Sequence, residues 1–229
     1  MNDPAPVITL DGPGGAGKGT IGSLLAERLG WRYLDSGALY RIAAFAAMRL
    51  KARFSDEAAL GDICRGLDVH FRPEPGAAPG VLLAGRDVSA EIRTEEVGNA
   101  ASKIAAMPGV RAALLDRQRD FRAPPGLVAD GRDMGTTVFP DAGCKIFLTA
   151  SPEERALRRH KQLKEKGIEA SIPALARDIA ERDARDANRS LSPLRPAEDA
   201  RILNTDGMSI EAVLERALFW MKSPEWEEG

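Results

Sequence analysis

The pattern of hydrophobic positions begins with a short apolar run, Val7 to Leu10, that is rich in β-branched residues. Such a run, followed by a glycine cluster, predicts a strand that is buried on both faces. Beyond the glycines, apolar residues recur every three or four positions from Ile21 to Leu29, which predicts a helix that Gly30 ends. Three further apolar runs predict buried strands, at 127–129, 145–148 and 201–203. Helical patterns separate these strands, so the sequence predicts a parallel α/β sheet.

Two of the separating helices carry clear signals. One begins at Ser151, a capping residue, with Pro152 in the first turn and Glu154 three residues after the serine. The last helix of the chain presents an apolar face from Ile210 to Leu218. Both signals place helices between or after the predicted strands, as an α/β fold requires.

Residues 62–90 break this alternation. Apolar and polar residues alternate with period two over 67–71, a segment rich in proline and glycine follows at 73–80, and an apolar run occupies 81–83. The pattern predicts a small antiparallel hairpin inserted into the α/β body.

Composition and charge narrow the class of protein. The 229 residues are 44% hydrophobic and 29% charged, which fits one mid-sized globular domain carrying insertions. A formal net charge of −2 argues against a protein that coats nucleic acid. Cys64 and Cys144 fall in no metal or redox spacing, which is typical of reduced thiols. The N-terminus lacks a secretory pattern and the longest apolar run, 42–48, is too short to span a bilayer, so we expect a cytoplasmic protein with no membrane or nucleic-acid partner.

The glycine cluster is the first candidate site. It reads Gly12, Pro13, Gly14, Gly15, Ala16, Gly17, Lys18, Gly19 and Thr20. Lying between a strand and a helix, its backbone N–H groups can surround phosphates, and Lys18 can neutralise the β and γ phosphates of a nucleotide. Gly19 stands where a serine or threonine is usual, so the Mg²⁺ ligand stays open between Thr20 and an intervening water.

Two polar segments occupy positions where ligands bind. Asp35 or Ser36 can cap the helix that follows them, but Arg41 lies close to the positive end of that helix, where a bound anion would offset the cost. Residues 130–133 directly follow a buried strand, and ligands of open α/β sheets bind at the carboxyl ends of strands. The alternative for 130–133 is an ordinary polar surface turn.

A third segment, 171–190, places charges on an apolar helix face. The stripe Ile172, Leu175 and Ile179 continues at the same spacing into charged residues, namely Arg182, Asp186 and Arg189. Either the helix extends beyond the core, or these charges point into a cleft. We favour the cleft, because a solvated charge run would not continue the inward face.

Together these motifs resemble those of the bacterial cytidylate kinases. The matching segments are the glycine loop, 35–41, 99–102, 130–136 and 181–189, and the likeness runs from about Val7 to the final helix. It implies an α/β, P-loop three-layer fold with a central parallel sheet. It also implies a core domain (1–36, 109–153 and 190–229), a monophosphate-binding domain (37–108, with an antiparallel insert at about 62–90) and a lid region (154–189).

The resemblance also implies an activity, Mg²⁺-dependent transfer of the γ-phosphoryl group of ATP to CMP or dCMP, by a monomer. The residues implied in catalysis are Lys18, Arg132, Asp133 and Arg182. ATP is implied to bind loop 12–20 and Arg158 of the lid. The residues implied to bind CMP are Ser36, Arg41, Ser102, Arg111, Arg132, Asp133, Arg182, Asp186 and Arg189.

Two other functions remain open on the sequence. A kinase for a hydroxyl acceptor, such as shikimate or gluconate, would need a general base, for which Asp35, Asp130 or Asp133 could serve. The arginines outside the glycine loop are too many for an acceptor with little charge. A nucleotide-dependent binding module is the second alternative, although the sequence contains no evident apolar interaction helix.

Overall fold

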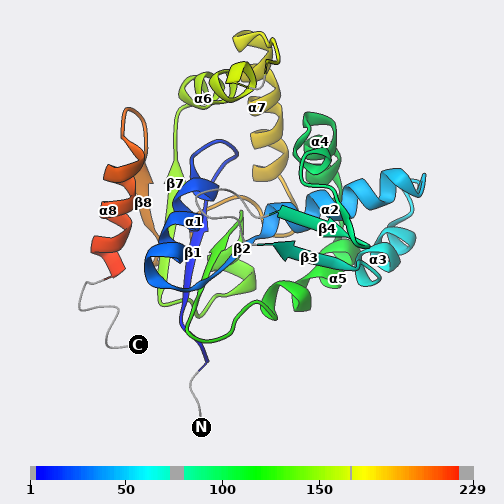
Figure 1. The fold of residues 1–229 in the computed structure, drawn as a ribbon, viewed down its shortest axis with the longest axis horizontal. Helices are drawn as coiled ribbons and strands as arrows, with labels where there is room; N and C mark the ends of the chain where they lie inside the picture. Colours follow the sequence, from blue (N-terminus) through cyan, green and yellow to red (C-terminus); the bar gives the residue numbers. More distant parts are fainter. Residues whose placement is uncertain (1–3, 73–79, 166, 222–229) are drawn as a thin grey trace.

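The computed structural model describes residues 4–72, 80–165 and 167–221, and its centre is a sheet of five parallel strands (Figure 1). The strands are β1 (Val7–Asp11), β2 (Arg32–Asp35), β6 (Leu127–Asp130), β7 (Cys144–Thr149) and β8 (Arg201–Asn204). They run in the order β2-β6-β1-β7-β8, with β1 fully buried in the middle. The parallel α/β sheet and its four predicted strands are confirmed, but β8 was wrongly predicted to be buried. It is an edge strand, and its Ile202 is 60% exposed.

The edge strand β2 was not predicted. Of its residues only Leu34 is buried, while Arg32, Tyr33 and Asp35 carry polar groups. An edge strand of a parallel sheet has one open side, so it lacks the continuous apolar run of a central strand.

Apolar side chains cover the central sheet on both faces, giving three layers. On one face, α1 (Lys18–Leu29) and α8 (Ile210–Met221) pack against Ile8, Leu10 and Ile146. On the other face, residues of the π-helix η2 (Met134–Val138) pack against Val7 and Leu127. As predicted, α1 ends at Gly30, whose φ is 65°.

A second lobe contains its own apolar cluster. Its elements are α2 (Ser36–Arg49), α3 (Glu57–Arg65), β3 (Val69–Arg72), β4 (Gly80–Leu83), β5 (Arg86–Asp87), η1 (Glu91–Arg93), α4 (Glu95–Ile104) and α5 (Pro108–Arg119). The predicted insert is confirmed as an antiparallel sheet, but it has three strands in the order β3-β4-β5, and residues 62–65 are the last turn of α3. The predicted proline- and glycine-rich loop, 73–79, lies outside the described residues.

Two helices, α6 (Pro152–Glu165) and α7 (Ile172–Ala187), pack side by side at the top of Figure 1. Ser151 caps α6 as predicted, its Oγ accepting from the N–H of Glu154 at 3.2 Å. The predicted helix over 171–190 is shorter, so Arg189 lies beyond its end. Within the described ranges, no helix combines the length and the apolar character that crossing a membrane requires.

Candidate active site

The glycine loop connects β1 to α1 in a conformation that only glycine adopts readily. Gly12, Gly15 and Gly17 have φ angles of 142°, 83° and 97°. A Cβ at Gly12 would lie 1.9 Å from the carbonyl oxygen of Leu148. Lys18, the first residue of α1, donates from Nζ to the carbonyl oxygen of Pro13 at 2.8 Å. The loop is thus closed on itself by the lysine, while Thr20 is exposed on the first turn of α1.

Lys18 is held where its charge is costly. Burial, with a smaller contribution from the nearby Arg132, lowers its pKa to about 7 against the opposing influence of Asp130 and Asp11. A polyanion bound in the loop would replace the lost hydration and restore the charge of this ammonium group. The buried ammonium group of Lys18 therefore favours the binding of phosphates in the loop.

Asp130 ends β6 beside the same loop. Its carboxylate accepts a hydrogen bond from Tyr33 Oη at 3.1 Å, and one of its oxygens lies 3.6 Å from where a Cβ on Gly19 would be. Burial raises the pKa of Asp130 to about 7, although Lys18 lowers it. Since Asp130, Gly131 and Asp133 are all buried, the segment 130–133 is not an ordinary surface turn.

Beside this loop, a cluster of charged side chains surrounds Asp186. The Asp186 carboxylate is 1% exposed and accepts from Ser102 Oγ and Arg132 Nε, both at 3.0 Å, and from Arg189. A second pair joins Asp133 to Arg111. Because α7 and the segment after β6 face α4 here, charges that are distant in sequence meet in one place.

A narrow cavity of about 50 Å³ brings together eight predicted site residues, namely Ser36, Ser102, Arg111, Arg132, Asp133, Arg182, Asp186 and Arg189. We call these eight residues the acidic-basic cluster. The charges at the end of α7 thus point into a cleft, as the sequence analysis favoured.

Two arginines of the cluster reach the glycine loop. A Cβ on Gly14 would lie 3.4 Å from Arg132 Nη2 and 3.8 Å from Arg182 Nη1. Burial, together with the nearby cations Arg132 and Arg41, lowers the pKa of Arg182 to about 10. The buried Nε of Arg182 has no hydrogen-bond partner. Arg132 and Arg182 therefore lie between the loop and the cluster, where a transferred phosphoryl group would pass.

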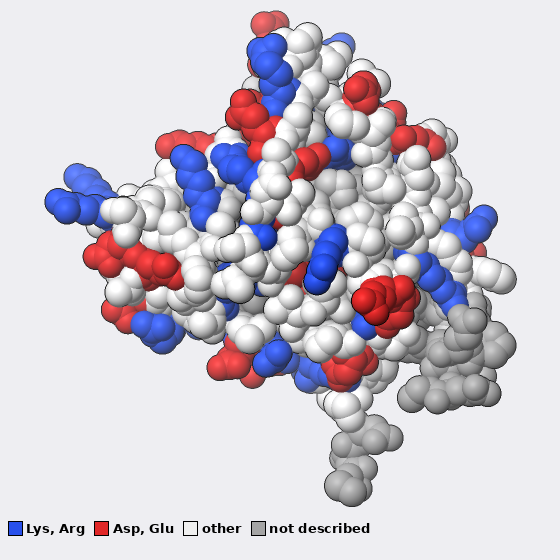
Figure 2. Space-filling view, turned by 180° about the vertical axis from the view of Figure 1, so that it is seen from behind, with Lys and Arg blue, Asp and Glu red and all other residues white. Residues whose placement is uncertain are grey.

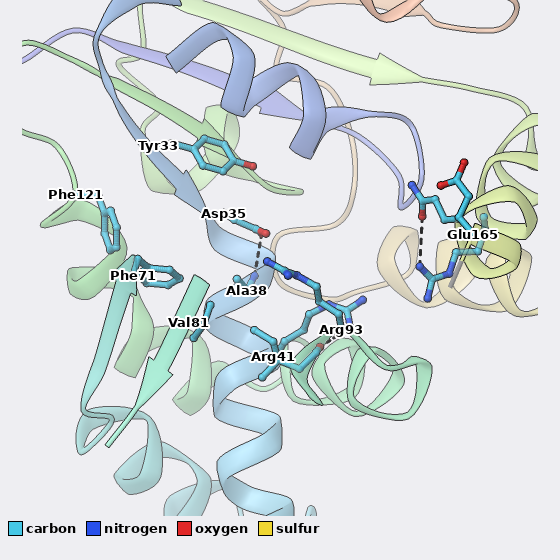
Figure 3. Close-up of a pocket in the computed structure, with 12 residues that line it drawn as sticks. Tyr33, Asp35, Ala38, Arg41, Phe71, Val81, Arg93, Phe121 and Glu165 are labelled. Carbon is cyan, nitrogen blue, oxygen red and sulfur yellow. Dashed lines mark hydrogen bonds between the residues drawn. The ribbon is translucent and has the colours of Figure 1, made fainter. Parts of the chain in front are cut away.

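Arg41 lies at the border of two cavities. Its Nη1 donates to the carbonyl oxygens of Ile92 (2.9 Å) and Thr94 (3.1 Å). One cavity, of about 160 Å³, joins Arg41 to Gly14 and Arg182. The other, of about 440 Å³, is shown in Figure 3, where Arg41 and Arg93 lie opposite two phenylalanines, Phe71 and Phe121.

Asp35 and Arg158 are placed by their hydrogen bonds, and Ser36 by its burial. Asp35 provides the cap of α2, accepting from the N–H of Ala38 at 2.9 Å (Figure 3), and Ser36 is buried in the acidic-basic cluster. Arg158 is not in the cluster. It donates to Thr205 Oγ1 (3.0 Å) and to the Thr205 carbonyl oxygen (2.7 Å), beside the other side of the glycine loop.

Several residues that shape the site were not among the predicted site residues. Arg155 is buried against the loop, donating to the Gly14 carbonyl oxygen at 3.2 Å and pairing with Asp183 at 2.6 Å. Asp11 accepts two backbone N–H groups from the segment after β6. The rule that ligand-binding residues follow buried strands would have indicated Asp11, whereas no sequence signal indicated the Tyr33–Asp130 contact.

Basic and acidic side chains are interspersed on the face seen in Figure 2. That face has no extended basic surface of the kind that binds the phosphate backbone of a nucleic acid, and the net charge of the whole chain is −2. The clustered arginines lie instead inside the site.

Comparisons with known proteins show the family of the chain. The cytidylate kinase family model matches residues 8–223. A cytidylate kinase of Bordetella bronchiseptica is 58% identical over 94% of this chain and 95% of its own length, and one of Pseudomonas aeruginosa is 54% identical over 99% and 100%. Among solved structures, a gluconokinase of Sinorhizobium meliloti aligns with 96% of this chain and 93% of its own, at 13% identity and a TM-score of 0.45. The chain belongs to the cytidylate kinase family.

Proposed function

We propose that this protein transfers the γ-phosphoryl group of ATP to CMP or dCMP, giving ADP and CDP or dCDP. One observation carries the proposal: a buried cluster of arginines, carboxylates and serines lies directly beside a phosphate-binding loop. The loop accounts for a triphosphate donor, and the cluster accounts for an acceptor that is both charged and rich in hydrogen-bonding groups.

The donor binds through loop 12–20. Its N–H groups and the positive end of α1 face the phosphates, and Lys18 regains a full charge when they bind. Arg158, on the other side of the loop, is placed to contact the rest of the nucleotide.

The acceptor binds in the acidic-basic cluster. Cytosine offers acceptors at O2 and N3 and a donor at N4, which suit Arg111, Arg189 and the Ser102 hydroxyl. Asp133, Arg182 and Asp186 are assigned to the ribose. The phosphate is assigned to Arg41 and Arg132, with Ser36 nearby. The ion pairs Arg189–Asp186 and Arg111–Asp133 hold these side chains ready, and partial exchange of those pairs for substrate contacts opens the cavity.

Transfer needs no general base. The acceptor phosphate has a second pKa of about 6 and is already an anionic nucleophile at neutral pH. The transition state is loose and spreads negative charge over the moving phosphoryl group. Lys18, Arg132 and Arg182 lie around its path and stabilise that charge.

The residues beside the loop fit a magnesium ion. Asp130 provides a buried carboxylate and Thr20 an exposed hydroxyl, both hard oxygen ligands of the kind Mg²⁺ prefers. Bound there, the ion would neutralise the β and γ phosphates.

The assignment of domains is also part of the proposal. Separate apolar clusters in the sheet region, in the α2–α5 lobe and between α6 and α7 support a core, a monophosphate-binding domain and a lid. Closure of the lid over ATP would exclude water, which otherwise accepts the phosphoryl group.

The rival with a hydroxyl acceptor has one observation in its favour, since burial raises the pKa of Asp130 to about 7, in the range of a general base. A coupled assay of ADP formation separates the two, using ATP with CMP, dCMP, UMP, shikimate and gluconate in turn. We expect rapid ADP formation with CMP and dCMP. ADP formation with a sugar acid but not with CMP would contradict the proposal, and equal ADP formation without any acceptor would favour a nucleotide-dependent switch.

A further inference from the structure

Asp11, the last residue of β1, joins the phosphate loop to the segment that carries Arg132 and Asp133. Its side chain is 4% exposed. One carboxylate oxygen accepts from the N–H of Met134 at 2.9 Å, and the other accepts from the N–H of Gly135 at 2.8 Å. Both oxygens of this carboxylate are therefore used by backbone groups two and three residues after Arg132.

Those two N–H groups open the helix η2. The first N–H groups of a helix have no partner inside it, and the residue before the helix usually caps them with its own side chain. Asp133 occupies that position, and aspartate is among the best capping residues. Yet Asp133 makes no capping hydrogen bond, and its carboxylate instead pairs with Arg111.

We propose that Asp11 is a positioning residue for the acceptor site, acting through Asp133. By capping η2 from the neighbouring strand, Asp11 leaves the Asp133 carboxylate free to face Arg111 and the acceptor. The inference rests on the proposed function, because it assigns Asp133 to the acceptor.

The chemistry of Asp11 predicts what replacing it does. An asparagine at this position has one acceptor oxygen, and its NH₂ group would face an N–H that has lost its partner. Leaving a buried donor unsatisfied is costly. The Asp133 carboxylate is the nearest alternative cap, so the variant draws it away from Arg111.

The test is a double-mutant cycle with Asp11→Asn, Asp133→Asn and the double variant, measuring kcat, the KM for each substrate, and CMP binding by calorimetry without ATP. For Asp11→Asn we expect the KM and Kd for CMP to rise about tenfold. The KM for ATP stays within about twofold. Because Asp11 acts through Asp133, the double variant binds CMP little worse than Asp133→Asn alone.

Thr9→Val is the matched control, since Thr9 lies in the same strand, is fully buried, and has an Oγ1 without a hydrogen-bond partner. It should leave both KM values unchanged. Asp11→Glu is a second variant that keeps the charge but displaces the turn, and it should also raise the KM for CMP selectively. Additive effects in the cycle, or an equal loss for ATP and CMP, would overturn the inference. A wild-type protein that does not phosphorylate CMP would instead overturn the proposed function.

Discussion

At the scale of single residues, the site is built from charges that burial makes unfavourable in the free protein. Lys18 has its pKa lowered to about 7, and Asp11 and Asp130 have theirs raised to about 6 and about 7, with burial as the largest cause each time. These groups lie within one region of the site and are stabilised only in part by each other. Bound phosphates would stabilise the charged form of Lys18 but not those of the two carboxylates, which need a cation beside them.

The first prediction concerns Lys18. Lys18→Ala removes the cation that neutralises the β and γ phosphates, so we expect kcat to fall at least about a hundredfold with every acceptor. Steady-state kinetics with CMP and with dCMP measure this. A loss confined to one acceptor would show that Lys18 acts on the acceptor rather than on the donor.

The second prediction concerns base recognition by Arg189. Arg189→Ala should weaken discrimination between CMP and the other monophosphates by about tenfold or more. An arginine that donates several charged hydrogen bonds to the edge of a base contributes strongly to the preference for that base. The KM for ATP should hardly change, since Arg189 lies away from the loop. The ratio of kcat/KM values for CMP, UMP, AMP and GMP measures the effect. An equal loss for all four would show that Arg189 does not read the base.

The third prediction follows from the raised pKa values of Asp11 and Asp130. Between about pH 4 and about pH 7 the folded protein holds protons that the unfolded chain releases, so these groups make the free energy of unfolding fall as pH rises through that window. Asp130→Asn removes one of them and can still accept from Tyr33 Oη. Urea unfolding should therefore find the variant more stable than wild type by about 1 to 2 kcal/mol at pH 8 and nearly equal at about pH 4. A constant difference at both values would contradict this cause.

At the scale of secondary-structure elements, the sequence predicted the helices and strands whose buried residues recur in a regular pattern. The central strands and α1, α6 and α8 follow apolar patterns or caps that need no partner to be recognised. The edge strand β2 and the two-residue β5 were missed because each depends on pairing with a strand whose position only the fold sets. The same reason explains which parts of the site were missed. Sequence motifs indicated Asp186 and Arg132 as site residues, but not the hydrogen bond between them, because it joins two elements that are 54 positions apart in the sequence.

The fourth prediction tests how α6 and α7 are held together. Arg155 on α6 is almost fully buried and pairs with the partly exposed Asp183 on α7. Asp183→Asn leaves a buried guanidinium without its counter-charge, so we expect a loss of about 1 to 3 kcal/mol in the stability of this helix pair. Asp62→Asn is the control, because the pair Arg65–Asp62 is exposed and should contribute less than about 0.5 kcal/mol. Thermal unfolding with hydrogen exchange of α6 and α7 measures both, and equal effects would rule out a special role for Arg155.

At the scale of the whole molecule, three groups of elements meet at the site. The α6–α7 pair contacts the α2–α5 lobe through Arg159 and Glu95 at 2.6 Å and through Arg185 and Asn99 at 2.9 Å. It contacts the loop through Arg155. The space these contacts leave between Gly14 and α7 is about 160 Å³, whereas nucleotide-sized ligands occupy pockets of about 300 Å³ or more. The α6–α7 pair therefore contacts both the lobe and the loop, an arrangement that we call closed, and we propose that ATP binding needs this pair to move.

The last prediction concerns this opening. Glu95→Gln removes the charge that pairs with Arg159 without changing the size of the side chain, so the closed arrangement of the free protein should become less populated. Amides of α6 and α7 should then exchange hydrogen faster in the variant than in wild type, by about two- to fivefold, since a partly exposed pair contributes up to about 1 kcal/mol. Saturating ATP analogue with CMP should largely remove the difference, because the bound phosphates then hold the arginines. Asp87→Asn, in an exposed pair of the small sheet, serves as the control and should leave α6 and α7 unaffected. Exchange in α6 and α7 that is equal in the free and bound wild type would contradict closure over the substrates.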